Sequence, residues 1–315
     1  MPTLTATLPK GVKVGHWTNR DAWTGCTVCL LPEGSVASCE VRGGAAGTFG
    51  TDILQPASAG PGANAIVLTG GSAFGLAAVD GVVRWLSERG VGFETPATRV
   101  PLVGAAVVYD LGLGDPLTRP GAGEGYSACE AAADQFECGS VGAGTGCTVG
   151  KLLGADSWTK GGLGFASERL STGGTVSAIA VVNAVGDVVA RDGSVLAGMR
   201  RAGSALSSAE AITSGLAIRR PWREATTLVC VLTDVALTKL DAWMCARAAN
   251  GGVARAVSPV WTPFDGDTVF CAATREVPGD PLTVSLIAAE VVAEAIRHGV
   301  LAATGAPDCP AVSEL

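Results

Sequence analysis

Two adjacent threonines, Thr226 and Thr227, stand where a charged stretch of the sequence meets an apolar one. Residues 228–232 are apolar and rich in β-branched types, which predicts a buried strand that begins at the threonines. A threonine at the head of such a strand is either an ordinary β-branched residue or a hydroxyl placed for chemistry. The preceding residues 194–224 are small, polar and locally basic, so we expect an exposed loop of the kind at which chains are cut.

A catalytic role for Thr226 would need a base. The chain has only two histidines, His16 and His298, and neither stands among candidate acids or nucleophiles, so a Ser-His-Asp or Cys-His mechanism is not favoured. If the chain cuts itself before Thr226, that residue gains a free α-amine with a pKa of about 7.7–8.0. Such an amine can take the hydroxyl proton without a histidine. The hypothesis is therefore an N-terminal nucleophile.

Two carboxylates, Asp265 and Asp267, flank one glycine in the segment TPFDGDTVF. In an extended chain, residues two apart share a side, so both carboxylates could serve one site. Asp-Gly is also a common turn pair. On the residues alone, a surface turn before a strand is the favoured interpretation, and a catalytic pair is the second.

The glycine-rich run GSVGAGTGCTVGKLLG does not match a nucleotide-binding motif. A P-loop would need glycine at position 145 and Ser or Thr after Lys151, whereas the residues there are Thr145 and Leu152. The dinucleotide fingerprint fails at Cys147 in the same way. Close backbone packing and backbone N–H groups that bind a carboxylate or an oxyanion both remain open.

The composition narrows the class of protein. The chain has 315 residues, 48% of them hydrophobic, with 44 glycines and a net charge of −7, which predicts a compact globular domain with a large core. No basic cluster indicates nucleic acid as a partner. No segment reads as a signal peptide or a membrane span, so we expect a cytoplasmic protein without a membrane partner.

The ten cysteines are expected to be reduced, buried side chains. Cys26 and Cys29 form a C-x-x-C within a strand pattern, where residues three apart face opposite sides and suit neither a redox helix nor a zinc site. We therefore predict no metal and no cofactor.

The hydrophobic pattern predicts strand pairs interleaved with long helices. We expect hairpins around residues 32–34 and 183–186, a helix that begins at the capping pattern Thr238-x-x-Asp241 and ends near Asn250, and a final helix that ends near residue 299. Such an order favours stacked sheets covered by helices over a purely parallel α/β array.

Several motifs together resemble one family over almost the whole chain. These are GCTVCLLPEG, VRGGAAGT, AIVLTGGSAFGL, VPLVGAAVVYDLG, VGAGTGCTVGKLLG, KGGLG, AVVNAVGDVV, TTLVCVLTD and TPFDGDTVF. The sequence is similar to the L-aminopeptidase/D-esterase (DmpA-type) hydrolases, which include β-peptidyl aminopeptidases and the nylon-oligomer hydrolase. The resemblance implies an α/β fold of the αββα sandwich type, one domain over residues 1–315, and hydrolysis of amide bonds.

The resemblance also implies how the protein matures. It implies self-cleavage between Ala225 and Thr226 into an α chain of residues 1–225 and a β chain of residues 226–315, with Thr226 as the nucleophile. The αβ units would assemble into a homo-oligomer, most simply a homotetramer. The other site residues that the resemblance implies are the orienting pair Asp265 and Asp267, the oxyanion-side Asn183, the site-lining Tyr109, and Lys151 near the nucleophile.

Within the family, the substrate remains open. Aminopeptidases of this type carry Ser and Glu where this chain has Asp265 and Asp267, whereas the nylon-oligomer hydrolase carries two aspartates. The leading hypothesis is an aminopeptidase acting on short peptides or amino-acid amides. The alternatives are a 6-aminohexanoate-oligomer hydrolase, an acyltransferase of the ornithine acetyltransferase type, and an uncut homologue without catalytic activity.

Overall fold

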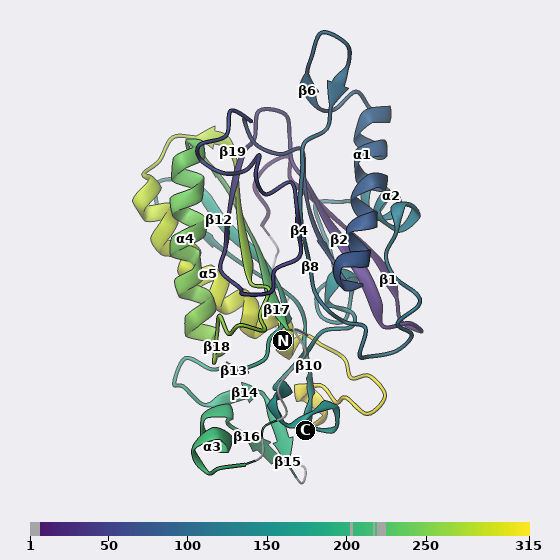
Figure 1. The fold of residues 1–315 in the computed structure, drawn as a ribbon. Helices are drawn as coiled ribbons and strands as arrows, with labels where there is room; N and C mark the ends of the chain where they lie inside the picture. Colours follow the sequence, from purple (N-terminus) through teal and green to yellow (C-terminus); the bar gives the residue numbers. More distant parts are fainter. Residues whose placement is uncertain (1–6, 202–203, 217, 219–224) are drawn as a thin grey trace.

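A computed structural model describes residues 7–201, 204–216, 218 and 225–315. Two five-stranded sheets lie face to face, and helices cover the outer face of each sheet (Figure 1). The predicted αββα sandwich is confirmed.

The first sheet holds most of the N-terminal strands. It is covered by α1 (Ala78–Glu88) and α2 (Ala122–Glu130). Its strands lie in the order β1 (Lys13–Asn19), β2 (Thr24–Leu30), β5 (Ala65–Thr69), β8 (Val103–Val107) and β4 (Thr48–Phe49).

The second sheet contains the strand that begins at Thr226. It is covered by α4 (Lys239–Ala256) and α5 (Pro281–Leu301). Its strands lie in the order β11 (Gly162–Arg169), β12 (Thr175–Asn183), β17 (Thr226–Val235), β19 (Thr268–Val277) and β3 (Val36–Val41). β17 and β19 are parallel, and the other neighbours in this sheet are antiparallel.

Side chains of β17 alternate between two cores, as expected for a strand covered on both faces. Leu228, Cys230 and Leu232 lie in the core between the two sheets. Val229 and Val231 lie in the core between the second sheet and its helices. The sequence prediction of a buried strand is confirmed, and the strand begins at Thr226 itself.

Both predicted hairpins are wrong. The turn at residues 32–34 joins β2 of the first sheet to β3 of the second. The turn at residues 183–186 joins β12 to β13 (Asp187–Val189), which pairs with β14 (Val195–Ala197) and β18 (Val257–Ser258) in a separate small sheet. Each turn therefore carries the chain from one sheet to another.

A small lobe lies at the end of the sandwich where β17 begins (Figure 1). It includes the small sheet and the segment predicted to be a loop. That segment contains β14, β15 (Met199–Arg201), β16 (Ser204–Leu206) and α3 (Ser208–Thr213), so it is not simply a loop where the structure describes it. Residues 202–203, 217 and 219–224 of the predicted loop lie outside the described residues.

Short elements complete the described chain. They are β6 (Phe93–Glu94), β7 (Arg99–Val100), β9 (Thr148–Val149), β10 (Thr159–Lys160) and the 3-10 helices η1 (Ser72–Ala77), η2 (Gly142–Gly144), η3 (Lys151–Leu153), η4 (Ala155–Ser157) and η5 (Val312–Glu314). Within the described ranges, no helix has the length and apolarity needed to cross a membrane.

Two local predictions agree with the structure. Thr238 caps α4, because its Oγ1 accepts the backbone N–H of Asp241 at 3.1 Å, although the helix continues past Asn250 to Ala256. All ten cysteines are free, and all except the half-buried Cys138 are buried. They act as small apolar side chains in the cores, as the sequence predicted.

Candidate active site

The hydroxyl of Thr226 lies against the backbone carbonyl that precedes it. Thr226 is 5% exposed, and its Oγ1 donates to the carbonyl oxygen of Ala225 at 2.5 Å. The same oxygen accepts the backbone N–H of Gly266 at 2.9 Å. The carbonyl that would be attacked in self-cleavage is therefore held by two donors, one of them the candidate nucleophile.

Backbone hydrogen bonds from residues 42–45 hold the segment that carries the two aspartates. Arg42 N and Gly43 N donate to the carbonyl oxygen of Asp267 at 2.9 and 3.1 Å. Ala45 N donates to the carbonyl oxygen of Asp265 at 2.9 Å. A Cβ at position 43 would overlap this segment, so glycine is needed for the close approach of the two backbones.

Both aspartates are buried, and the surface-turn interpretation is wrong. Asp265 and Asp267 are each 2% exposed. Asp265 Oδ2 accepts the backbone N–H of Thr262 at 2.7 Å, and Asp267 Oδ1 accepts that of Thr227 at 2.5 Å. Each carboxyl is thereby oriented by a backbone donor, and Asp267 is tied to the start of β17.

Burial raises the pKa of both carboxyls. Burial and, to a smaller extent, the negative charge of Asp265 together raise the pKa of Asp267 to about 8. Burial also raises the pKa of Asp265, while hydrogen bonds from Thr262 and the positive charge of Lys151 oppose that rise. A pair of this kind can take up and release a proton near neutral pH, as acid–base chemistry requires.

Asn183 connects the nucleophile to the other predicted residues. It is the last residue of β12 and lies opposite Thr226 in the antiparallel register. Its Oδ1 accepts Lys151 Nζ at 2.8 Å and the backbone N–H of Thr148 at 3.0 Å. Its Nδ2 donates to the carbonyl oxygen of Tyr109 at 2.9 Å. Asn183 thus holds three segments together beside β17.

Lys151 and Tyr109 border a small cavity next to Asn183. The cavity is too narrow to hold a water molecule and is also lined by Thr148 and Trp158. Lys151 is buried, and its Nζ lies 5.5 Å from the centre of the Trp158 ring. Tyr109 lies just beyond the end of β8 at Val107, so the first sheet contributes one wall of this region.

Sequence reasoning missed Asp110, which is buried directly after Tyr109. Its carboxylate accepts the hydroxyl of Thr24 and the backbone N–H of Gly71, each at 2.7 Å. Burial raises its pKa to about 6, and the positive charge of Lys151 opposes that rise. The available signal was an aspartate shortly after the end of a buried strand.

The two histidines make hydrogen bonds elsewhere. His16 Nδ1 lies 2.9 Å from the hydroxyl oxygen of Thr27. His298 Nδ1 accepts the backbone N–H of Phe165 at 3.2 Å. These partners belong to the packing of β1 on β2 and of α5 on β11, which agrees with a mechanism that does not use histidine.

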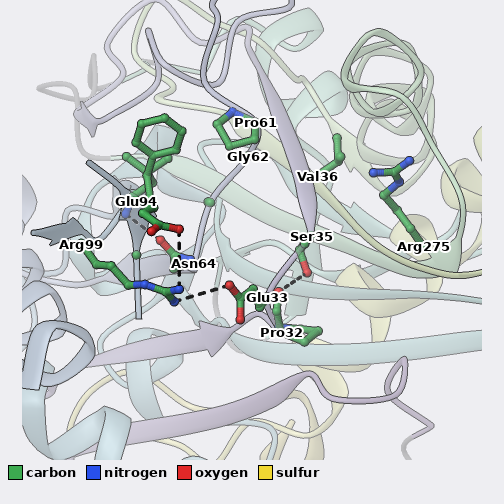
Figure 2. A pocket seen from close by; sticks show the side chains of 15 residues that line it. Pro32, Glu33, Ser35, Val36, Pro61, Gly62, Asn64, Glu94, Arg99 and Arg275 are labelled. Atoms are coloured by element: carbon green, nitrogen blue, oxygen red, sulfur yellow. Dashed lines mark hydrogen bonds and ion pairs between the residues drawn. The ribbon is translucent and has the colours of Figure 1, made fainter. Parts of the chain in front are cut away.

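A larger hollow lies far from Thr226. Figure 2 shows it beside Arg99, whose guanidinium pairs with Glu33 at 3.5 Å and Glu94 at 3.9 Å. β3 begins there at Val36, which pairs with Ala273 late in β19. Because β17 and β19 are parallel and both begin at the other end of the sheet, this hollow is not part of the candidate active site.

Comparisons with known proteins cover nearly all of the chain. The sequence model of peptidase family S58 matches residues 9–309. A protein of Mycobacterium tuberculosis (strain ATCC 25618 / H37Rv) named as an uncharacterized aminopeptidase is 38% identical over 97% of this chain and 96% of its own length. A 6-aminohexanoate-oligomer endohydrolase of Agromyces sp. (strain KY5R) is 31% identical over 85% of this chain and 74% of its own length.

Solved structures show the same fold. The L-aminopeptidase D-Ala-esterase/amidase from Ochrobactrum anthropi aligns with a TM-score of 0.71 at 22% identity, over 96% of this chain and 87% of that chain. A β-aminopeptidase of Burkholderia sp. aligns with a TM-score of 0.70 at 24% identity, over 94% of this chain and 85% of that chain.

Proposed function

The chain belongs to peptidase family S58 and is a peptide-bond hydrolase, and we propose that it activates itself by cutting its backbone between Ala225 and Thr226. The observation that carries the proposal is the 2.5 Å contact of Thr226 Oγ1 with the Ala225 carbonyl oxygen. The hydroxyl lies beside the group it must attack, on a residue fixed at the head of a buried strand.

The cutting reaction is an acyl shift followed by hydrolysis. Thr226 Oγ adds to the carbonyl carbon of Ala225, the C–N bond breaks, and the proton lost by the hydroxyl ends on the freed nitrogen. Water then cleaves the new ester, which leaves a carboxylate on Ala225 and restores the hydroxyl of Thr226. The products are an α chain of residues 1–225 and a β chain of residues 226–315.

The same threonine then acts on substrate. Its free α-amine takes the hydroxyl proton, and Oγ attacks the substrate carbonyl to form an acyl-enzyme that water releases. Asp265 and Asp267 orient and polarise the nucleophile. Asn183 stabilises the oxyanion, and Lys151 and Tyr109 line the site around it.

We propose short peptides or amino-acid amides as substrates, with release of the N-terminal residue. The mycobacterial relative bears the name of an aminopeptidase and matches over almost its whole length, which supports this choice. A second candidate is hydrolysis of 6-aminohexanoate oligomers. It is favoured by the buried Asp265–Asp267 pair, by the bond from Lys151 to Asn183, and by the 31% identity to an endohydrolase of that class.

A panel of substrates distinguishes the candidate activities. Matured enzyme is assayed with aminoacyl p-nitroanilides, β-peptides and 6-aminohexanoate oligomers, with and without free amino acids as acyl acceptors. Aminopeptidase activity predicts the fastest turnover on the p-nitroanilides or peptides. Fastest turnover on the oligomers would select the second candidate, and ping-pong kinetics that require an acceptor would select an acyltransferase.

Three variants test the nucleophile. Thr226→Ala is expected to give one folded, uncut and inactive chain. Thr226→Ser keeps a hydroxyl and is expected to cut, and Thr227→Ala is the matched control that is expected to cut as the wild type does. Normal activity in Thr226→Ala would contradict the proposal.

The assembly and location are also proposals. We propose a cytoplasmic homotetramer of αβ units, on the basis of the family resemblance. Native mass spectrometry of the cut enzyme is expected to show four copies of each chain, and a single αβ unit at working concentration would contradict it.

A further inference from the structure

Gly266 touches both partners of the proposed cleavage reaction. Its backbone N–H donates to the carbonyl oxygen of Ala225 at 2.9 Å. Ala225 and Asp265 form an isolated parallel bridge, which fixes the glycine alongside the bond that is cut. A Cβ built on Gly266 would lie only 2.7 Å from Thr226 Oγ1.

Turn geometry does not explain why this residue is glycine. The φ angle of Gly266 is not among the positive values that favour glycine. After Thr226 Oγ1, the next atoms that a Cβ would meet are backbone atoms of Ala45 and Ala46, both at 3.3 Å, which would have to move by a few tenths of an ångström. The contact closer than 3.0 Å is therefore the one with the candidate nucleophile.

We propose that Gly266 is part of the self-cleavage machinery. Its N–H stabilises the negative oxygen that forms on the Ala225 carbonyl, and its lack of a side chain leaves the space that the Thr226 hydroxyl occupies. This inference rests on the proposed self-cleavage and assigns the oxyanion donor of that step.

When Thr226 Oγ adds to the Ala225 carbon, the π-electron pair of the carbonyl moves to its oxygen, where the Gly266 N–H meets the charge. The pair returns as the C–N bond breaks, and the nitrogen takes the proton that the hydroxyl lost. A fixed backbone donor suits this role because it needs no rearrangement as the charge develops.

The test is the rate of self-cleavage of Gly266→Ala. The methyl group displaces the hydroxyl, and a misplacement of this size commonly slows a reaction by about 100-fold. Gly251→Ala is the matched control, because a Cβ at Gly251 in α4 meets nothing within 4 Å. We expect the control to cut at the wild-type rate, as followed by denaturing mass spectrometry.

Two outcomes distinguish a failure of this inference from a failure of the proposed function. A wild-type chain that stays whole would contradict self-cleavage itself. A wild-type chain that cuts at Thr226 while Gly266→Ala cuts equally fast would leave the proposed function standing and overturn the role of Gly266.

A double-mutant cycle of melting temperatures tests the role of Gly266 even where Gly266→Ala folds poorly. Thr226→Val keeps a methyl group in place of Oγ1, Thr226→Ala leaves that space empty, and neither variant can cut. Adding Gly266→Ala is expected to lower the melting temperature strongly beside Val and little beside Ala. Equal losses in the two backgrounds would show that residue 266 does not share space with the Thr226 hydroxyl, and the inference would be wrong.

Discussion

At the scale of single residues, the proposed catalysis by Thr226 uses two carboxyls that are buried in the fold. Asp265 and Asp267 flank a glycine that contacts the Ala225 carbonyl, and both are 2% exposed. Replacing either by asparagine keeps a similar shape and a hydrogen-bond acceptor while removing the ability to exchange a proton. The two effects of these carboxyls, on chemistry and on stability, can therefore be measured separately.

We predict that Asp265→Asn and Asp267→Asn each slow turnover by about 100-fold or more, because a positioned proton-transfer group is lost. The rate is measured per cut enzyme on a p-nitroanilide substrate, and thermal melting is recorded alongside. At pH 4, melting should stay near that of the wild type, since the acceptors for Thr262 and Thr227 remain. Near wild-type turnover in either variant would return that aspartate to a structural role.

The raised pKa of Asp267 predicts a particular pH dependence of stability. Its pKa is about 8 in the folded chain and about 3.9 when unfolded. The neutral carboxyl therefore stabilises the fold fully below about pH 4, and this contribution is lost as the pH rises through about 8.

The uncut variant Thr226→Ala and the double variant Thr226→Ala/Asp267→Asn isolate this effect. Their melting temperatures should be similar at pH 4, and the double variant should melt increasingly higher than the single variant as the pH approaches 9. A constant difference across that range would mean that Asp267 is ionised throughout.

Asn183→Ala is predicted to lower kcat more than it raises KM. An oxyanion donor acts mainly on the transition state, and removing one commonly costs roughly 100- to 1,000-fold in rate. The variant also loses the acceptor of Lys151 Nζ, so Lys151→Met is the matched control for that contact. A change confined to KM, or an equal effect of both variants on kcat, would mean that Asn183 serves only to hold Lys151.

At the scale of elements, the alternation of β17 gives its two threonines different surroundings. Thr226 begins the row that faces the core between the sheets, and Thr227 begins the row that faces α4 and α5. Thr227 is buried, and its hydroxyl has no hydrogen-bond partner among the described residues. Such a group costs free energy on folding.

Thr227→Val is therefore predicted to raise the free energy of unfolding by about 1 kcal/mol while self-cleavage continues. Valine has the same shape and replaces the unpaired hydroxyl by a methyl group. Chemical denaturation in the Thr226→Ala background measures the first effect, and mass spectrometry of Thr227→Val alone measures the second. Loss of cleavage in Thr227→Val would mean that the second hydroxyl takes part in the reaction.

Local patterns predicted the elements better than their pairing. The β-branched run after Thr226 and the capping pair Thr238 and Asp241 are local signals, and the structure has both features. The turn at residues 32–34 misled the prediction because it is equally compatible with a hairpin and with a crossing between layers. Which sheet a strand joins depends on burial by distant segments.

The burial of the aspartates could not be predicted for the same reason. The segment that covers Asp265 and Asp267 comes from residues 42–45, about two hundred positions earlier in the sequence. The motif resemblance pointed to six site residues. In the structure Asp265 pairs with Ala225, Asp267 accepts the N–H of Thr227, and Asn183 lies opposite Thr226. Lys151 and Tyr109 are each joined to Asn183 by a hydrogen bond. The resemblance could not predict the contact of Gly266 with the Ala225 carbonyl, because that contact depends on two segments meeting in the fold.

At the scale of the whole molecule, the proposed cut divides the sequence but not the sandwich. Residues 226–315 supply β17, β19, α4 and α5. β17 pairs with β12 on one side, and β19 pairs with β3 on the other, so both central strands are held between strands of the α chain. The α4 and α5 cores also include residues from β12.

We therefore predict that the two chains remain associated after cleavage. Size-exclusion chromatography without denaturant should give one peak that contains both chains, and denaturant should separate them. Thr226→Ala, which stays whole, is the matched control for the elution volume. Separate elution of the two chains in buffer would mean that the strand pairing described here does not hold the cut protein together.

The most direct test of the central claim is a time course of intact mass and activity on freshly purified wild-type protein. Self-activation predicts that the 31.4 kDa chain gives way to two chains, that the new N-terminus is Thr226, and that activity rises in proportion to the cut fraction. Fully active protein that remains a single chain, with Met1 as its N-terminus, would contradict the account.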